Sequence, residues 1–328
     1  MSLDNIRTDS EYDLINRYQE SDDSSMEYNS PFQYGKNPCR YFDPDEFRLM
    51  IDQYKDSNSS YFHLNCRGLS SHWDSFHDLI SDLHTDTFAF DYIGISESFR
   101  TEADLRVHLP GYHNYISRSR VNSPRGGVGL FIRDNINYII RDDISVFIPN
   151  VFESIFVEIC NQSCKNEIVG VIYRPNTEPY ADLDIFETNI CEIMNITTKE
   201  QKQCIIMGDM NIDLLKFESQ NKTERYLDII FSNGFVPVIV KPTRISSSTA
   251  TLIDHIYTNN ISTVGQSGII ITDVADHFGT FHISNKKVIT TDSNVKYIRH
   301  LSKAKIQTFT RSLELLDFTD ILSTMCAN

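Results

Sequence analysis

The sequence predicts a domain of the α/β class with mixed β-sheets. Short apolar runs, typical of buried strands, recur between residues 61 and 283, and segments with apolar residues at helical spacing lie between them. Some neighbouring strands have hairpin-like connections, so we expect antiparallel pairs beside parallel ones. With 40% hydrophobic residues, among them 20 Phe and 16 Tyr, the chain can form a substantial core.

The first predicted elements lie between residues 61 and 132. Residues 61–65 and 92–95 predict two strands, and a helix is expected between them, N-capped by Ser70 or Ser71 and ending near residue 83. Residues 126–132 contain glycines, but their spacing differs from the dinucleotide-binding fingerprint and no helix follows. We therefore expect a strand that packs closely against a neighbour there.

The middle of the chain centres on residues 203–213. Residues 152–159 and 167–173 predict strands, and the second stops near Pro175, which cannot donate to a ladder. Residues 183–194 predict an amphipathic helix. The four apolar residues 204–207 then predict a central strand covered on both sides. Gly208 allows the backbone to turn or to approach another segment closely.

The last predicted elements of the domain follow this strand. Residues 224–231 predict a helix that stops at Asn233 and Gly234. Residues 236–240 predict an edge strand because they contain Pro237. Residues 252–257, 269–272 and 280–283 predict three further strands, the last of which closes the sheet.

The two ends of the chain differ in composition from this middle part. Residues 1–58 are rich in Ser, Asp, Asn and Tyr, and acidic residues outnumber basic ones 13 to 6 over residues 1–60. They predict a disordered acidic leader with a short helix over residues 43–54. The domain itself is expected over residues 59–285. Residues 286–328 are expected to form a linker and an amphipathic helix over residues 303–316, outside the core domain.

Composition restricts the class of protein. No apolar run approaches the roughly 18–20 residues that span a bilayer, and the polar N-terminus is not a secretory signal. Seven cysteines, an odd number, fit a reducing compartment, so we expect a nuclear or cytoplasmic protein. The net charge of −15 argues against wholesale wrapping of nucleic acid. Local steering of a polyanion needs only a basic patch, for which Arg118, Arg174 and Arg244 are among the candidates.

Polar side chains recur at the ends of the predicted strands. Each has an ordinary structural explanation: the central strand, for example, can simply run into an Asx turn at Asp209. Asp209 and Asn211, two apart on an extended chain, can also project from one face of a strand end. A carboxylate and an amide at the rim of a sheet suit metal-assisted phosphate chemistry. The full set is Asn65, Glu97, Tyr173, Asp209, Asn211, Asp254, Asp276 and His277.

In this order, the set resembles the endonuclease/exonuclease/phosphatase superfamily over residues 61–284. The motifs that carry the resemblance are Asn65, Glu97, Gly208-Asp209-Met210-Asn211, Ile253-Asp254-His255 and Asp276-His277. Other segments resemble the endonuclease domain of non-LTR retrotransposon polyproteins: residues 65–69, 126–129, 152–154, 173–176 and 251–255. Abasic-site endonucleases of this fold usually carry Asp where Arg67 stands. Inositol-phosphate phosphatases usually show an aromatic residue and Arg where Ile212 and Asp213 stand.

The resemblance implies a four-layer sandwich of two mixed β-sheets flanked by helices, and a site for Mg²⁺, with Mn²⁺ as a substitute. Glu97, helped by Asn65, would hold the ion, because Mg²⁺ prefers oxygen ligands. Asp209 would orient or deprotonate the attacking water, and Asn211 would bind the phosphate. His277 would stabilise the phosphate oxygens, with Asp276 fixing its ring, and Tyr173 would donate to a phosphate oxygen.

The remaining implications concern Asp254, the substrate and the product. Asp254 would either help protonate the leaving oxygen or position His277. We expect substrate contacts from Arg174, Thr243 and Arg118. The expected protein is a monomer that nicks DNA and leaves 3′-hydroxyl and 5′-phosphate ends. Two alternatives stay open: a phosphomonoesterase or small-substrate phosphodiesterase on the same fold, and an inactive remnant that serves as a binding module.

Overall fold

The structure is a computed structural model that describes residues 8–20, 39–54, 59–99, 107–121, 123, 125–160, 165–176, 180–285 and 310–311. The chain divides into two units, Met1–Val288 and Ile289–Asn328. In the second unit only Thr310 and Arg311 are described, both helical, so the helix predicted over residues 303–316 lies mostly outside the described residues. Among the described helices, none is long and apolar enough to cross a membrane.

The first sheet contains seven strands, and it is mixed as predicted. β2 runs parallel to β3, and β1 runs parallel to β15, whereas the other neighbours are antiparallel. In spatial order the strands are β1 Arg40–Phe42, β15 Val264–Ile270, β16 Gly279–Ser284, β2 Ser59–Asn65, β3 Tyr92–Ser96, β5 Val128–Ile132 and β4 Ile116–Arg118.

The second sheet is also mixed and has β10 near its centre. β10 pairs in parallel with β9 and antiparallel with β14, and it is buried from Cys204 onward, so the predicted central strand is confirmed. The path of strands is β11 Val236–Pro237, β14 Asp254–Thr258, β10 Gln203–Asp209, β9 Glu167–Tyr173, β8 Phe152–Ile159 and β6 Tyr138–Ile140, with β7 Phe147–Ile148 beside β8. A separate hairpin joins β12 Arg244–Ile245 to β13 Ala250–Thr251.

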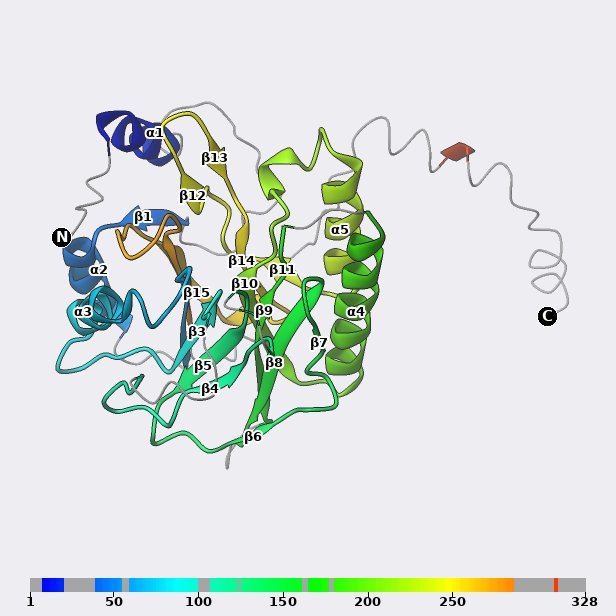
Figure 1. Cartoon of the computed structure of the whole chain (residues 1–328), viewed down its shortest axis with the longest axis horizontal. Helices are drawn as coiled ribbons and strands as arrows, with labels where there is room; N and C mark the ends of the chain where they lie inside the picture. The colour runs from blue at the N-terminus through cyan, green and yellow to red at the C-terminus, as the bar shows by residue number, and fades with distance from the viewer. Residues whose placement is uncertain are drawn as a thin grey trace, which may run out of the picture. The chain divides into compact units, whose positions relative to one another are not determined.

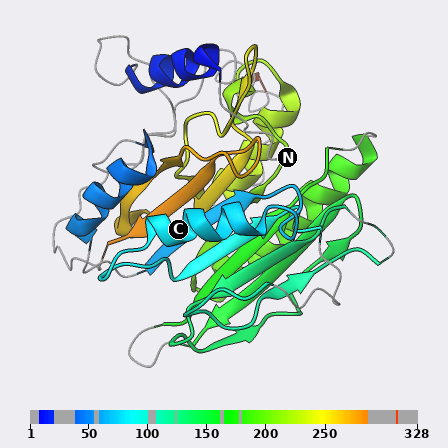
Figure 2. The same cartoon turned by 60° about the vertical axis from the view of Figure 1, so that its left-hand side comes forward.

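The two sheets pack face to face, and helices cover their outer faces (Figures 1 and 2). α2 Pro44–Ile51 and α3 Trp73–Leu83 lie on the first sheet, and α4 Tyr180–Lys199 and α5 Asn221–Ser232 lie on the second. Consecutive residues of β2 illustrate the layers: Tyr61 belongs to the core between the sheets, and Phe62 to the core under α2 and α3. This is the alternation expected of a strand covered on both faces. The predicted four-layer sandwich is confirmed.

The N-terminal region corrects one prediction. Residues 8–20 and 39–54, expected within a disordered leader, form α1 Asp9–Glu20, β1 and α2. β1 pairs with β15 far along the chain, and the Tyr41 backbone N–H donates to the Gln19 side chain of α1 at 3.0 Å. A three-residue strand carries no periodic signal of its own, so pairing gives it structure that the sequence pattern does not predict. The short helix predicted over residues 43–54 is confirmed by α2 and the 3₁₀ turn Asp52–Tyr54 that follows it.

The start of α3 is a second correction. The helix begins at Trp73 after His72, and neither Ser70 nor Ser71 caps it. The preceding residues form a turn in which the Gly68 carbonyl accepts the backbone N–H groups of Ser71 and His72. This turn delays the helix and directs the chain away from the end of β2.

Candidate active site

Strand ends from both sheets meet at one edge of the sandwich. Asn65 ends β2, and Glu97 follows β3, which lies in register beside it. In the second sheet Asp209 ends β10 and pairs with Tyr173 of β9 and Asp254 of β14. Each sheet therefore brings polar side chains to the same rim.

Asn65 joins the two sheets at this rim. Its Nδ2 donates to Glu97 Oε1 at 3.0 Å and to Asp209 Oδ2 at 2.8 Å. Its Oδ1 accepts the backbone N–H of Arg67 at 3.1 Å. The amide therefore bridges two carboxylates as a donor, so in this rotamer it does not present the oxygen that the predicted metal-ligand role requires.

The backbone around Asp209 is tightly constrained. Gly208 has a φ of +151°, and a Cβ there would lie 1.8 Å from the Ile172 carbonyl oxygen, so only glycine fits. Asp209 Oδ1 accepts the backbone N–H of Asn211 at 2.9 Å, which forms the Asx turn considered from the sequence. Burial, and next the charge of Asp254, raise the pKa of Asp209 to about 7.

Asn211 corrects a prediction. Its φ is +48°, so the chain is not extended there and the side chain does not project in parallel with that of Asp209. Instead Asn211 Nδ2 donates to the backbone carbonyl of Arg174 at 2.8 Å. The bond links the turn after β10 to the end of β9, so its amide nitrogen serves the backbone here and not a phosphate.

His277 is held by Asp254. His277 Nδ1 donates to Asp254 Oδ2 at 2.8 Å, and the hydroxyl of Thr243 donates to the same oxygen at 2.7 Å. Burial alone would lower the pKa of His277, but the charge and hydrogen bond of Asp254 outweigh it and raise the pKa to about 9. Burial would raise the pKa of Asp254, yet the His277 charge and the hydrogen bonds hold it below its usual value. The pair is therefore an imidazolium and a carboxylate at neutral pH.

Asp276 does not fix the ring of His277, contrary to the prediction. Its Oδ1 lies 4.0 Å from His277 Nε2, which is beyond a hydrogen bond. Its Oδ2 instead accepts from Arg67 Nη1 at 2.9 Å, and from Arg244 Nε at 2.9 Å and Nη2 at 2.6 Å. Of the two roles left open for Asp254, its contact with His277 favours the positioning role.

The sequence did not indicate His63, which lies behind this pair. His63 Nε2 is 2.9 Å from the Ser96 hydroxyl, and its Nδ1 is 4.0 Å from Asp254 Oδ1. Burial lowers the pKa of His63 to about 4, so the ring is neutral at pH 7. The only available signal is its position two residues before Asn65, which places it on the same face of β2.

The turns that carry the site are strained. Arg67, Glu97 and Asn211 are among the few described non-glycine residues with positive φ, at +43°, +50° and +48°. Such conformations cost of the order of 1–3 kcal/mol and persist where the surroundings enforce them. Tyr173 lies next to this rim, where burial raises its pKa and the charges of Glu97 and Asp209 raise it further. Its hydroxyl is therefore a proton donor at neutral pH.

Residues 62–277, more than half of the chain, match the Endonuclease/Exonuclease/phosphatase family. The chain belongs to this family. Its members are hydrolases that include nucleases and phosphatases, so the family supports a hydrolytic role for the rim. Among curated proteins, no significant match to the chain was found.

Solved structures share the fold of this family member at low sequence identity. The Xenopus laevis APE2 catalytic domain has a TM-score of 0.52 and 18% identity, covering 71% of this chain and 94% of that one. The 3′ phosphatase NExo from Neisseria, bound to product DNA hairpin, has a TM-score of 0.53 and 11% identity, covering 70% and 100%. The human Nocturnin catalytic domain has a TM-score of 0.51 and 12% identity, covering 69% and 93%.

The three residues expected to contact substrate make contacts within the protein. The Arg174 side chain is buried with its guanidinium 5.7 Å from the Phe186 ring, and its Nη1 donates to the Pro175 carbonyl. Thr243 is fully buried and holds Asp254. Arg118 donates to the Ser145 carbonyl at 2.9 Å and pairs with Asp142. Arg174 and Thr243 are thus buried, and Arg118 is partly exposed and held by an ion pair.

The donor set at the rim fits a hard divalent cation. Ligand atoms of Asp209, Asp254 and His277 lie within 4.8 Å of one another. His277 already donates to Asp254 and is protonated, so it has no lone pair to offer at Nδ1. The remaining oxygens come from Asp209, from Glu97 across the Asn65 amide, and from Asp254, whose Oδ1 has no hydrogen-bond partner among the described residues. Oxygen donors of this kind suit Mg²⁺.

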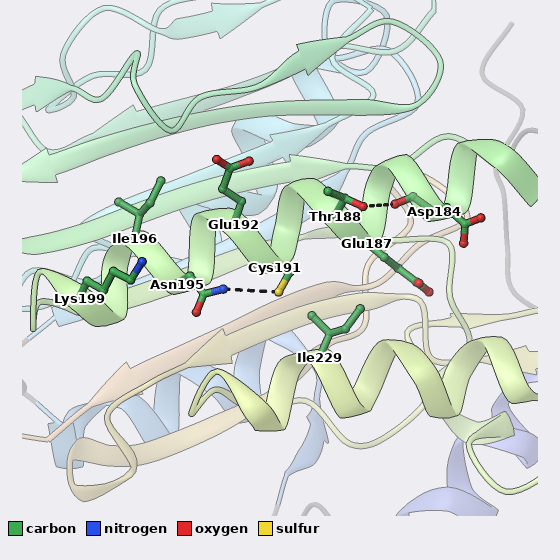
Figure 3. A pocket seen from close by; sticks show the side chains of 9 residues that line it. All are labelled: Asp184, Glu187, Thr188, Cys191, Glu192, Asn195, Ile196, Lys199 and Ile229. Carbon is green, nitrogen blue, oxygen red and sulfur yellow. Dashed lines mark hydrogen bonds between the residues drawn. The ribbon is translucent and has the colours of Figure 1, made fainter.

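Two surface grooves differ in their relation to the rim. One groove of about 570 Å³ runs along α4, with Ile229 of α5 on its other side (Figure 3), and it contains none of the predicted site residues. The other groove, of about 410 Å³, includes Arg244 and Asp276 and is continued by the β12–β13 hairpin. Of these two grooves, the second includes Asp276, whose Oδ1 lies 4.0 Å from His277 Nε2.

Proposed function

We propose that this chain is a Mg²⁺-dependent phosphodiester hydrolase that nicks DNA and leaves 3′-hydroxyl and 5′-phosphate ends. The observation that carries the proposal is the meeting of Glu97, Asp209 and His277 at one rim, although they come from different sheets. Had these three side chains lain in separate regions, the proposal would have failed. Membership of a family of nucleases and phosphatases supports the reaction class.

The site contains one group for each task of the reaction. Asp209, with a pKa near neutrality, orients the attacking water and accepts its proton. His277, protonated at neutral pH, donates from Nε2 to the phosphate oxygens as negative charge develops there, while Asp254 and Thr243 hold its ring. Tyr173 donates to a further phosphate oxygen.

A bound Mg²⁺ would neutralise charge on the phosphate and the leaving oxygen. Glu97 would hold it, and Asn65 would reach it if the amide turned its oxygen toward the ion. Glu97 accounts for the expected ion dependence, and the unpaired Oδ1 of Asp254 adds a further carboxylate oxygen at the rim.

DNA is the proposed substrate for two reasons. The structural relatives include a phosphatase described with a product DNA hairpin. The motifs around Asn65, Tyr173 and Asp254 also resemble those of non-LTR retrotransposon endonucleases, so we propose the same origin for this chain. We further propose that it acts as a monomer in the nucleus or cytoplasm and binds DNA through a local basic patch.

A phosphomonoesterase is the second candidate, because one of the structural relatives is itself a 3′ phosphatase. The two reactions need the same groups at the rim and differ in what lies beside the reacting phosphate. An inactive remnant is disfavoured, since Glu97, Asp209 and the Asp254–His277 pair are all in place.

The deciding experiment incubates the full chain with supercoiled plasmid in Mg²⁺ and in EDTA. We expect relaxed, nicked circles with Mg²⁺ only, and we expect DNA ligase alone to reseal them, because ligase requires adjacent 3′-hydroxyl and 5′-phosphate ends. Phosphate release from nucleotides and inositol phosphates is measured in parallel. Phosphate release from these small esters without plasmid nicking would refute the endonuclease proposal and support the phosphomonoesterase.

A further inference from the structure

Two arginines from distant parts of the chain converge on one carboxylate oxygen beside His277. Arg67 follows β2, and Arg244 begins β12. Three of their N–H groups donate to Asp276 Oδ2, at 2.9, 2.9 and 2.6 Å. Asp276 Oδ1 accepts no hydrogen bond within the described residues and faces His277 Nε2 at 4.0 Å.

Stability alone does not explain this cluster. The side chains of Arg67, Arg244 and Asp276 are 52%, 45% and 36% exposed. Ion pairs with that exposure typically contribute little to folding. Arg67 also occupies a left-handed backbone conformation, which costs free energy. One carboxylate cannot neutralise two guanidinium groups, so these three side chains together carry a net positive charge, and the charge of Glu97 also acts on Arg67.

The geometry resembles that of a bound phosphate with a carboxylate in its place. Guanidinium groups donate to carboxylate and phosphate oxygens alike, and here three of their N–H groups converge on the single oxygen Asp276 Oδ2, as they would on one phosphate oxygen. The neighbouring groove provides space for a chain that continues past the cluster, with Ser246, Thr249 and Thr251 of the hairpin along it. Glu11 and Asp273 also line that groove, so its charge favours a phosphate beside the two arginines and not along the whole groove.

We propose that Arg67 and Arg244 clamp a backbone phosphate next to the scissile one and thereby select polynucleotides over isolated phosphate esters. The incoming phosphate replaces Asp276 between the two guanidinium groups. This inference rests on the proposed function, because it takes the rim around His277 as the place of the reacting phosphate. Arg67 and Arg244 would make a second phosphate in the substrate necessary for efficient cleavage.

The test begins with binding in EDTA, where no cleavage occurs. The full chain and its Arg67→Ala, Arg244→Ala and double variants are titrated against a fluorescein-labelled DNA duplex at several salt concentrations. We expect the double variant to bind at least tenfold more weakly, and the slope of log affinity against log salt to fall by about 0.9, as for one lost phosphate contact. Arg48→Ala is the matched control, since Arg48 is 40% exposed and also paired, to Asp45, but lies on α2.

A second measurement compares two substrates with Mg²⁺ present. The clamp variants should lose at least tenfold in kcat/KM on the DNA duplex and less than twofold on bis(p-nitrophenyl) phosphate, which has a single phosphate. Arg67→Lys and Arg244→Lys keep the charge without the fork, so they should keep the salt slope and still lose affinity. Thermal unfolding of each variant shows whether it folds. If an Ala variant does not fold, the Lys variants test the clamp in its place.

The outcomes separate the two proposals. Equal losses on both substrates, or equal DNA affinity for the wild type and the clamp variants, would overturn the clamp. A wild type that cleaves neither substrate would overturn the proposed function instead. In that case the EDTA titration still decides whether Arg67 and Arg244 bind a DNA phosphate, since an arginine-independent affinity refutes that binding as well.

Discussion

Three strands, β2, β9 and β10, carry a polar cluster at each end. They start at Ser59, Glu167 and Gln203, and they finish at Asn65, Tyr173 and Asp209. All of these residues except the half-buried Gln203 are buried, and in both clusters burial raises the pKa of a carboxyl group to about 7: Glu167 at the start and Asp209 at the finish. A perturbed pKa therefore does not by itself distinguish an active site from a structural cluster.

Hydrogen-bond partners make the difference between the two ends. Glu167 Oε1 accepts from the Tyr61 hydroxyl and from Gln203 Nε2 at 3.2 Å, and its Oε2 accepts from the Ser59 hydroxyl at 3.5 Å. At the other end Asp254 Oδ1 and His63 Nδ1 are buried without a partner among the described residues. The rim therefore keeps hydrogen-bonding capacity for a ligand or an ion, which the carboxyl group of Glu167 has already used.

The largest expected effect is on catalysis at the end with unpaired atoms. Asp209→Ala and His277→Ala should each lower the rate of plasmid nicking by about 10²–10⁴-fold, because each removes a proton-transfer or charge-stabilising group. Glu167→Gln, at the other end of the same strands, should keep the rate within about threefold, since it lies outside the proposed mechanism. Initial nicking rates of the three variants give the comparison. Equal nicking by the wild type and both rim variants would point to a contaminating nuclease or to a different site.

Metal affinity should show the next largest effect. Glu97→Gln removes a charged oxygen ligand, so the Mg²⁺ concentration at half-maximal nicking should rise at least about tenfold, the lower limit for loss of a group that supports a metal. Glu167→Gln again serves as the control because its carboxyl group accepts its hydrogen bonds far along the strands. A titration curve that does not change would remove Glu97 from the proposed ion site.

The stability of the protein should respond to pH through Glu167. Its pKa is about 7 when folded and near the usual 4.5 when unfolded, so the folded state holds the proton more tightly. The stabilising contribution is complete below pH 4.5 and is lost as the pH rises through 7, which amounts to about 3 kcal/mol. Asp209 shifts in the same direction, so Glu167→Gln should remove only part of the slope. Urea unfolding between pH 5 and 8 measures it, and an identical slope in the variant would contradict this account.

The sequence predicts the long strands well, because each contains enough residues to show a pattern of burial. β8 and β9 have the predicted bounds, residues 152–159 and 167–173, because a regular pattern of apolar residues over seven or eight positions reports directly on burial. β1, β12 and β13 have only two or three residues each and depend on partners, so no pattern within them is long enough to predict a strand. Periodicity therefore indicates long elements, and pairing determines the short ones.

The site was predicted as a set of residues but not as a set of contacts. The order of the motifs placed Asn65, Glu97, Asp209 and His277 together through the family resemblance. Which group holds His277 depends on how the sheets pack: Asp276 is its neighbour in sequence, yet Asp254 accepts its hydrogen bond. Arg174 follows β9, and the sequence alone does not show that its side chain is buried. Its guanidinium lies over the ring of Phe186, which belongs to α4.

The smallest expected effect distinguishes the two roles considered for Thr243. Its hydroxyl donates to Asp254 Oδ2 at 2.7 Å and accepts the Asp254 backbone N–H at 3.1 Å, so it positions the carboxylate that holds His277. Thr243→Val removes one hydrogen bond to a charged group, and we expect kcat to fall about tenfold with KM unchanged, since about 1.4 kcal/mol is lost in the transition state alone. Thr243→Ser should restore the rate. If KM rises while kcat stays the same, Thr243 contacts the substrate as first expected, and the buried hydroxyl must become accessible when DNA binds.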